Sequence, residues 1–336
     1  MKINDIINKE YADVHAADIQ KVYVSENLSN LILSYKEWIH SLNDERNISS
    51  YTNDWRYNSA IKKIKNWKYA SEDITAFSLA LTEFQDEKFF HYSGHFISSL
   101  INSDFEKTKQ TNPYLIITEL LQKPKNEILN FDQLGFLGVD NNGANISIKG
   151  TVGSYLGFGM KKGNIYVKGD VLEHCAYSLE GGTILIDGDC GGFFGVDMSG
   201  GIVQVKGNQT SIMGDLMSGG KIEIFGNAGN IRMQNGGEII VHKNIDSVGT
   251  EMKKGKVIIY GDAKSLGHSM EGGEIHLFGE QNNGKMMMNI KELHKSEKPT
   301  GGVIYHKEKR IFPQETIIEK YKRIIKKIGS LTKYKV

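Results

Sequence analysis

Short runs of alternating aliphatic and polar residues recur about every 19 residues between Asn145 and Gly279. In each run two aliphatic side chains stand one residue apart, as in Ile165-Tyr-Val167, so that one face of the run is apolar. A period of two is typical of a short β-strand with one buried face. Strands this short gain stability only by pairing with the equivalent strand of the next repeat. The pattern therefore predicts stacked coils, each adding one strand to a parallel sheet.

Glycine and methionine hold fixed places in the same repeat. Each unit begins with Gly, has Met or Leu three residues on and Gly three residues later, and ends with the aliphatic pair and a closing residue. Glycine at a corner permits positive φ or close backbone approach. The Met or Leu position predicts a second internal ladder. The residues at that position are Met160, Leu179, Met198, Met217, Met252 and Met270.

This spacing resembles the GXGXG repeat domain, which forms the C-terminal β-helix of the glutamate synthase large subunit and the core of one of the subunits of formylmethanofuran dehydrogenase. The resemblance covers about residues 139–280. It implies a right-handed parallel β-helix that joins catalytic domains or subunits without holding the reacting groups. No catalytic residue is therefore carried over, and residues 1–138 show no resemblance to the amidotransferase and flavin domains of glutamate synthase.

Two coils depart from the pattern. Ala176 stands where other coils have glycine, and the coil from Gly229 to Lys243 places Met233 four residues before Gly237 instead of three. We expect this sixth coil to be distorted.

Residues 1–138 contain few glycines and carry helical periodicity, which predicts a separate helical domain before a β-helix of residues 139–284. We expect four or five helices, one of them from Asn112 to Leu121 with Pro113 in its first turn and Pro124 after its end. The apolar positions at helical spacing are Leu28, Leu31, Ile32, Tyr35, Trp38, Ile39, Ile61, Ile64, Trp67, Ile74, Phe77, Leu81 and Phe84.

Residues 285–336 are expected to complete the fold. A last strand is predicted at Gly301–His306, and from Pro313 onward an apolar stripe with lysines around it predicts a basic amphipathic helix. That helix has three open roles: it caps the end of the solenoid, binds a protein partner, or lies on a membrane surface.

Composition narrows the function classes. The 336 residues carry 41 Lys and Arg against 40 Asp and Glu, a net charge of +1, so no overall field favours nucleic acid. The sequence has neither an N-terminal signal-peptide pattern nor 18 consecutive apolar residues, which predicts a cytoplasmic protein without a membrane partner. The two cysteines, Cys175 and Cys190, occupy different repeat positions, which argues against a disulfide or a metal pair.

His91 and His95 are the strongest candidates for chemistry outside the repeats. They lie four residues apart, which puts them on one face if a helix continues through both, and Glu83, Asp86 and Glu87 lie upstream. A metal site normally needs three or four ligands, so we expect no metal here and interpret both as partly buried, hydrogen-bonded histidines. Gly94 between them indicates either a helix break or close packing.

Other polar and aromatic positions have structural interpretations. Asp170, Asp187, Asp189 and Asp262 lie at or beside closing glycines, where calcium binding is one interpretation and ordinary turn chemistry the preferred one. The repeat histidines His174, His242, His268 and His276 are expected at the surface or at corners. Tyr166, Phe225, Tyr260 and Phe278 fall at outward or corner positions, where they form a partner patch or lie beneath the N-terminal helices.

The sequence therefore favours a non-catalytic scaffold subunit whose β-helix docks an enzyme partner. The resemblance points to a flavin-dependent glutamate-synthase-like amidotransferase system. No cofactor, metal or catalytic residue is predicted under this hypothesis. Two alternatives stay open: an enzyme with its site in the helical domain or at the junction, using His91, His95 and acidic neighbours, and a homo-oligomer built by solenoid packing.

Overall fold

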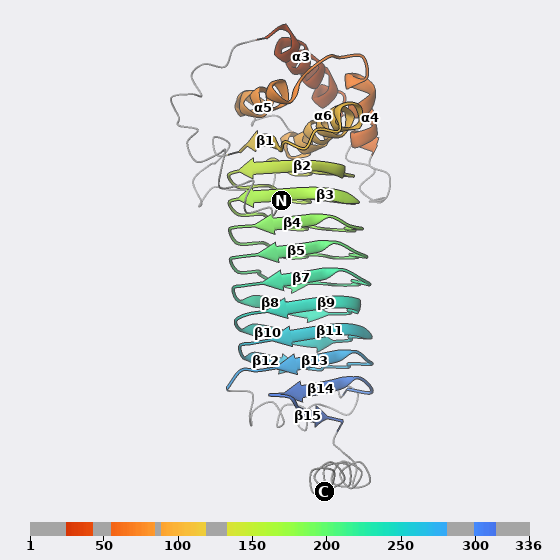
Figure 1. Ribbon diagram of the computed structural model, residues 1–336, viewed down its shortest axis with the longest axis vertical. Helices are drawn as coiled ribbons and strands as arrows, with labels where there is room; N and C mark the ends of the chain where they lie inside the picture. Colours follow the sequence, from red (N-terminus) through yellow and green to blue (C-terminus); the bar gives the residue numbers. More distant parts are fainter. Residues whose placement is uncertain (1–24, 43–54, 85–88, 119–132, 281–298, 314–336) are drawn as a thin grey trace, which may run out of the picture.

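The chain forms a parallel β-solenoid with a helical domain at one end (Figure 1). The computed structural model describes residues 25–42, 55–84, 89–118, 133–280 and 299–313. The solenoid makes about seven turns over residues 142–277. The mixed architecture of helices followed by a parallel β-solenoid is thus confirmed, whereas the predicted helix after Pro313 lies outside the described residues.

The helical domain lies over the first strands of the solenoid. Its α-helices are α3 (Glu26–His40), α4 (Trp55–Ile64), α5 (Ser71–Ala80) and α6 (Ser93–Thr108), with short 3-10 helices at Leu81–Phe84 and Phe90–Tyr92. Buried aromatic rings hold it together, because Tyr35 of α3 contacts Phe77, Phe84 and Phe96 with ring centroids 5.2 to 5.5 Å apart. The helical spacing in the sequence marks Tyr35, Phe77 and Phe84 but not Phe96.

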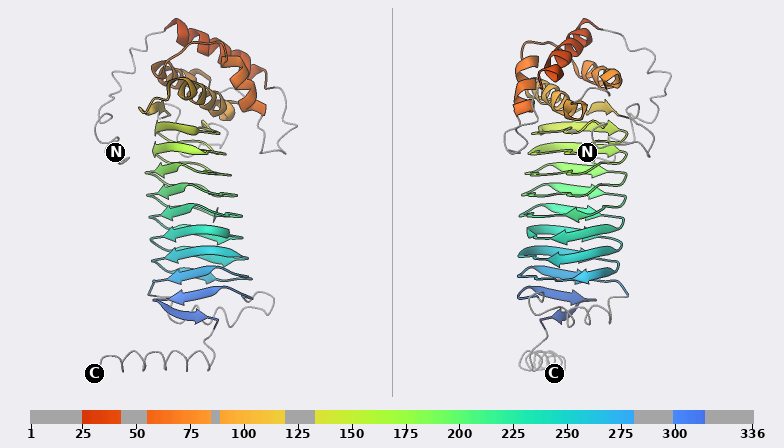
Figure 2. Two further views of the ribbon diagram at one scale, coloured as in Figure 1. Left: turned by 45° about the vertical axis from the view of Figure 1, so that its right-hand side comes forward. Right: turned by 180° about the vertical axis from the view of Figure 1, so that it is seen from behind.

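The solenoid contains two sheets that run along its axis (Figure 2). Among the described residues, the larger has eleven strands in the order β1-β2-β3-β4-β5-β7-β9-β11-β13-β14-β15, and the smaller has the order β12-β10-β8-β6. The first strands are β1 (Tyr114–Ile117), β2 (Asn142–Lys149), β3 (Lys162–Lys168), β4 (Thr183–Ile186), β5 (Ile202–Val205), β6 (Ile212–Met213), β7 (Lys221–Ile224) and β8 (Ala228–Arg232). The remaining strands are β9 (Asn235–Val241), β10 (Ile245–Thr250), β11 (Lys254–Ile259), β12 (Ala263–Leu266), β13 (Glu274–Leu277), β14 (Val303–His306) and β15 (Lys309–Phe312).

Strand register keeps the aliphatic pair of every coil in the interior. Ile184 pairs with Val203, and Val203 with Ile222, so that equivalent side chains stack coil after coil. All three have no exposed surface. The predicted last strand is confirmed as β14, which pairs in parallel with β13.

One predicted helix is wrong. The spacing predicts a helix over residues 112–121, but Tyr114–Ile117 forms β1, parallel to β2, and residues 119–121 lie outside the described part. A short apolar run cannot be assigned to helix or strand by periodicity alone. Here Ile116 pairs with Ile148, and the carbonyl of Leu115 accepts a hydrogen bond from Thr75 Oγ1 of α5 at 2.8 Å. The run is a strand because the helical domain covers it on the side away from β2.

The sixth coil is distorted as expected, and a glutamine replaces the methionine of the internal ladder. Gln234 stands three residues before Gly237 and is fully buried. Its Nε2 donates to the Gly236 carbonyl at 2.7 Å, whereas its Oε1 has no hydrogen-bond partner among the described residues. The pairing of β9 with β11 is irregular beside it. An internal amide thus takes the place of a thioether where the coil shortens.

We expect Gln234→Met to stabilise the protein by about 1 kcal/mol, because a buried acceptor without a partner is removed and the ladder becomes continuous. Chemical denaturation of the two proteins measures the change. The converse variant, Met217→Gln, introduces an amide at a position that needs none, and should destabilise by roughly 2 kcal/mol. A marked loss of stability in Gln234→Met would show that the distorted coil requires the amide.

Candidate functional site

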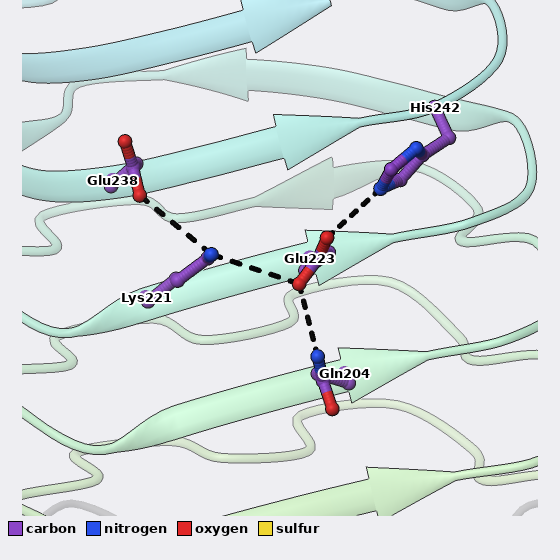
Figure 3. Close-up of polar contacts among 5 residues, drawn as sticks. All are labelled: Gln204, Lys221, Glu223, Glu238 and His242. Atoms are coloured by element: carbon purple, nitrogen blue, oxygen red, sulfur yellow. Dashed lines mark hydrogen bonds and ion pairs between the residues drawn. The ribbon is translucent and has the colours of Figure 1, made fainter.

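A connected group of polar side chains lies on the outward face of the large sheet (Figure 3). At its centre is Glu223 of β7, whose carboxylate accepts a hydrogen bond from Gln204 Nε2 at 3.0 Å. His242 Nε2 lies 2.9 Å from the other carboxylate oxygen. Lys221 bridges two acids, with its Nζ 3.7 Å from Glu223 and 3.9 Å from Glu238. The side chains alternate with the buried aliphatic residues, so the strand pattern itself places them outside.

Burial and hydrogen bonding act on Glu223 in opposite directions. Partial burial by itself raises the pKa of the carboxyl group, but the hydrogen bonds from His242 and Gln204 and the charge of Lys221 outweigh it. The net result is a pKa below the ordinary value of 4.5. The Glu223 side chain is 14% exposed, so it is held as a carboxylate within the sheet surface.

Because the pKa of Glu223 is lowered by folding, its stabilisation is present above the ordinary glutamate pKa and is lost as the pH falls through the folded value. We expect wild type to be more stable than Glu223→Gln by up to about 1 kcal/mol at neutral pH. The difference should shrink below pH 4.5, where the carboxylate begins to take up a proton. Thermal melts of both proteins across this range test it, and a difference that stays constant with pH would contradict the assignment.

A stack of aromatic rings runs beside this polar group. Phe225 stacks on His242 with centroids 4.5 Å apart and planes at 3°, His242 on Tyr260 at 5.3 Å, and Tyr260 on Phe278 at 5.4 Å. Each ring belongs to the residue that directly follows the end of its strand. Because the faces of the rings cover one another, the edges of the rings point outward. Phe225 is 40% exposed and Tyr260 49% exposed.

We define the outer strip as the outward side chains of β7, β9, β11 and β13 together with the residue after each strand. It has three columns. The edge column is Lys221, Glu238, Lys256 and Glu274; the central column is Glu223, Ile240, Ile258 and His276; the aromatic column is Phe225, His242, Tyr260 and Phe278. The edge column carries two lysines and two glutamates, the central column adds Glu223, and Phe225 and Tyr260 are exposed large hydrophobic residues of the strip.

The outer strip lies away from the helical domain. The helices contact the first strands, β1 and β2, at the opposite end of the solenoid from β11 and β13 (Figure 1). Phe225, Tyr260 and Phe278 therefore do not lie beneath the N-terminal helices. Of the two positions expected for these side chains, that one is wrong. Tyr166 is different, because it lies on β3 nearer the helices and its hydroxyl donates to Asp187.

His91 and His95 lie at the junction between the helical domain and the solenoid. His95 is fully buried, and its ring stacks on Phe136 with centroids 4.2 Å apart. Burial, together with the charges of Arg56 and His95, lowers the pKa of His91 to about 4. Of the predicted acidic neighbours, Asp86 and Glu87 lie outside the described residues, and the side chain of Glu83 does too. Among the described residues, both imidazoles pack at the junction between the helical domain and the solenoid.

Gly94 between these histidines serves close packing. A Cβ added at Gly94 would lie 1.9 Å from the carbonyl oxygen of Gly135 and 2.7 Å from the carbonyl carbon of Phe136. Gly94 is the second residue of α6, which begins at Ser93 directly after the 3-10 helix Phe90–Tyr92, so His91 and His95 do not share one continuous α-helix. The backbone of α6 therefore touches the backbone of the segment that leads into the solenoid.

A second aromatic column, which the sequence analysis did not identify, descends from this junction. Below His95 and Phe136 it continues through Tyr155, His174 and Phe193, with successive centroids 4.6, 4.5 and 5.0 Å apart. Burial lowers the pKa of His174, although the charge of Glu173 opposes the shift. The signal was present in the sequence, because Phe136, Tyr155, His174 and Phe193 are each 19 residues apart.

The corner carboxylates have a structural role. Asp170 Oδ1 accepts from the backbone N of Asp189 at 2.8 Å, and Asp189 Oδ1 accepts from the backbone N of Asn208 at 2.6 Å. Asn208, Asn227 and Asn244 continue the series down to Asp262. These side chains link one coil to the next, in keeping with the turn interpretation. Within the described ranges, no three His, Cys, Asp or Glu side chains are grouped so that they could hold a metal ion.

Three further observations bear on function. Cys175 and Cys190 are both buried and unlinked. Among the helices that the structure describes, none combines the length and the apolar character that crossing a bilayer requires. No protein-family model matches the sequence, and a comparison with curated proteins finds no significant match.

Proposed function

We propose that the chain is a non-catalytic scaffold protein that assembles with another protein chain through the outer strip of its solenoid. The observation that carries the proposal is the exposure of two rings of the aromatic column, Phe225 at 40% and Tyr260 at 49%. Exposed apolar side chains gathered on one face are typical of protein–protein contact sites, where aromatic residues are enriched.

The character of the strip favours a protein over other ligands. Its edge column alternates lysine and glutamate, so it has no net positive charge to attract the phosphates of nucleic acid. The aromatic rings cover one another's faces within the stack, so His242 and Tyr260 offer no free face on which a sugar or a base could stack. Ring edges beside aliphatic and paired charged side chains instead suit the mixed surface of a folded protein.

The resemblance of residues 139–280 to the GXGXG repeat domain adds a partner class to this proposal. In that family a right-handed β-helix joins catalytic domains or subunits, so an enzyme subunit is the partner expected for this chain. A flavin-dependent glutamate-synthase-like amidotransferase system is the most specific form of the idea. In this proposal the protein works in the cytoplasm.

Affinity purification of the full chain from its native cell at moderate salt, followed by mass spectrometry, tests the scaffold function. We expect a stoichiometric protein species with the wild type and its loss with Tyr260→Asp. Lys168→Glu is the matched control, because Lys168 is an exposed residue of the same sheet outside the strip. Recovery of the same species with Tyr260→Asp would contradict the role of the strip.

An enzyme with its site at the junction is the second candidate. The observation in its favour is the position of His91 at the junction beside Tyr92, where burial keeps its imidazole neutral at neutral pH. We expect the double variant His91→Ala, His95→Ala to lose stability modestly without any change in metal content. Near-stoichiometric zinc or iron in the wild type, lost in this variant, would favour the enzyme.

A further inference from the structure

The outer strip is self-complementary when its order along the solenoid is reversed. We propose that it binds the same strip of a second copy of the chain, with the two solenoids antiparallel and related by a two-fold axis between β9 and β11. The proposal rests on the assembly role of the strip proposed above, and it takes a second copy, instead of an enzyme subunit, as the occupant of the strip. In such an isologous contact each residue pair occurs twice.

The geometry of a face-to-face contact determines which residues meet. A two-fold axis parallel to the strands reverses the order of the coils and leaves each column opposite itself. With the axis between β9 and β11, β7 lies opposite β13 of the second copy, and β9 lies opposite β11. The register of the sheet, in which these strands are successive neighbours, makes the two halves of the strip equivalent in spacing.

The edge column specifies this arrangement by charge. Lys221 lies opposite Glu274 of the second copy, and Glu238 lies opposite Lys256 of the second copy, so that every charge meets its opposite. An axis displaced by half a coil step onto β9 places Lys221 opposite Lys256 and Glu238 opposite itself. Like charges across an interface are unfavourable, so the alternation selects one register.

The other two columns pair chemically alike or complementary groups about the same axis. Ile240 lies opposite Ile258 of the second copy in the centre of the contact. His242 lies opposite Tyr260 of the second copy, which would cover the 49% of Tyr260 that is exposed in the single chain.

The outer coils of the strip follow the same rule. Glu223 lies opposite His276, and Phe225 opposite Phe278, each time across the two copies. One coil further out on each side, Ile202 of β5, which is 43% exposed, lies opposite Val303 of β14. In the same outer coil, however, Lys206 after β5 lies opposite Lys307 after β14, so the complementary pairing ends at β7 and β13.

The size of the contact indicates its strength. The four coils of the strip, at about 4.8 Å each, span roughly 19 Å, and a strand of five residues is roughly 17 Å long. This footprint is small beside the ~800 Å² per partner that a stable interface buries. We therefore expect a dimer that dissociates on dilution.

Charge reversal in the purified full chain, followed by sedimentation velocity over a concentration series, tests the proposal. Wild type should form a dimer as its concentration rises. Glu238→Lys and Lys256→Glu should each weaken the dimer roughly tenfold or more, because each places two pairs of like charges in one contact. An equimolar mixture of the two variants should restore it, because positions 238 and 256 then carry opposite charges wherever they face each other across the mixed dimer.

The controls separate this inference from the scaffold function. Lys168→Glu, outside the strip, should dimerise as wild type does, and thermal melts of every variant show that it is folded. A wild type that is monomeric at all concentrations, single variants that dimerise normally, or a mixture that fails to recover would each overturn the proposal. If the pure chain is monomeric and Tyr260→Asp still loses a stoichiometric protein in the native purification, the second copy is wrong and the scaffold function stands.

Discussion

Replacement of Ile222 by aspartate is expected to prevent the solenoid from folding. Ile222 is fully buried, and it pairs with Val203 on one side and Ile239 on the other in the interior of the stack. A carboxylate placed there would have no partner, at a cost of several kcal/mol. Circular dichroism and thermal melting measure the loss.

Lys221→Asp is the matched control for this prediction. Lys221 precedes Ile222 and points to the opposite face, where its side chain is 36% exposed. Its replacement should lower the melting temperature only slightly, because the period of two places it outside the core and the loss is confined to its surface ion pairs with Glu223 and Glu238. An Ile222→Asp protein that melts like the wild type would show that this side chain is not in the core.

Substitution of Gly94 by alanine is expected to separate the helical domain from the solenoid. In an exposed helix this change stabilises by about 1 kcal/mol. At Gly94 the added methyl group would lie 1.9 Å from the Gly135 carbonyl oxygen. Because this oxygen belongs to the backbone, it can move away only if the whole segment moves. We expect steric strain to dominate and the free energy of unfolding to fall by more than about 2 kcal/mol.

Denaturation combined with limited proteolysis checks this result, because a displaced α6 should expose the segment that holds Phe136 and Leu137. Ser98 normally fixes that segment, since its Oγ donates to the Phe136 carbonyl at 3.0 Å and accepts from the Gly138 backbone N at 2.8 Å. Glu106→Ala, at an exposed position of the same helix, is the control. Equal stability of Gly94→Ala and Glu106→Ala would contradict the close contact.

The solenoid could be predicted from the sequence because its physics is local and repeated. A strand such as β7 (Lys221–Ile224) carries its own period of two, and the nearly regular spacing of the closing residues, almost all of them glycine, indicates the stacking. The same repetition revealed the distorted coil, since Met233 stands out of step. The repetition did not show that Gln234 occupies the methionine position of the internal ladder. A buried amide is tolerated there because the Gly236 carbonyl accepts a hydrogen bond from it, and that contact is visible only in the folded structure.

Features that depend on long-range contacts could not be predicted in the same way. Tyr114–Ile117 is a strand because β2 and α5 lie on either side of it, and its own residues fit a helix equally well. The junction histidines have helical spacing, but their burial against Phe136 follows from the docking of α6. The site was recognised only in part, because exposed aromatic positions such as Tyr260 have meaning only once the register of the sheet is known.

Covalent labelling of Tyr260 by hydroxyl radicals tests the central claim most directly, because it asks whether the outer strip is covered when the protein assembles. The native assembly and the same protein after dilution to single chains of 37.6 kDa are labelled in parallel. The scaffold account predicts that Tyr260 and Phe225 are protected in the assembly and reactive in the single chain, while Trp55, exposed on α4, reacts equally in both. Equal labelling of Tyr260 in an assembly that is heavier than one chain would contradict the account.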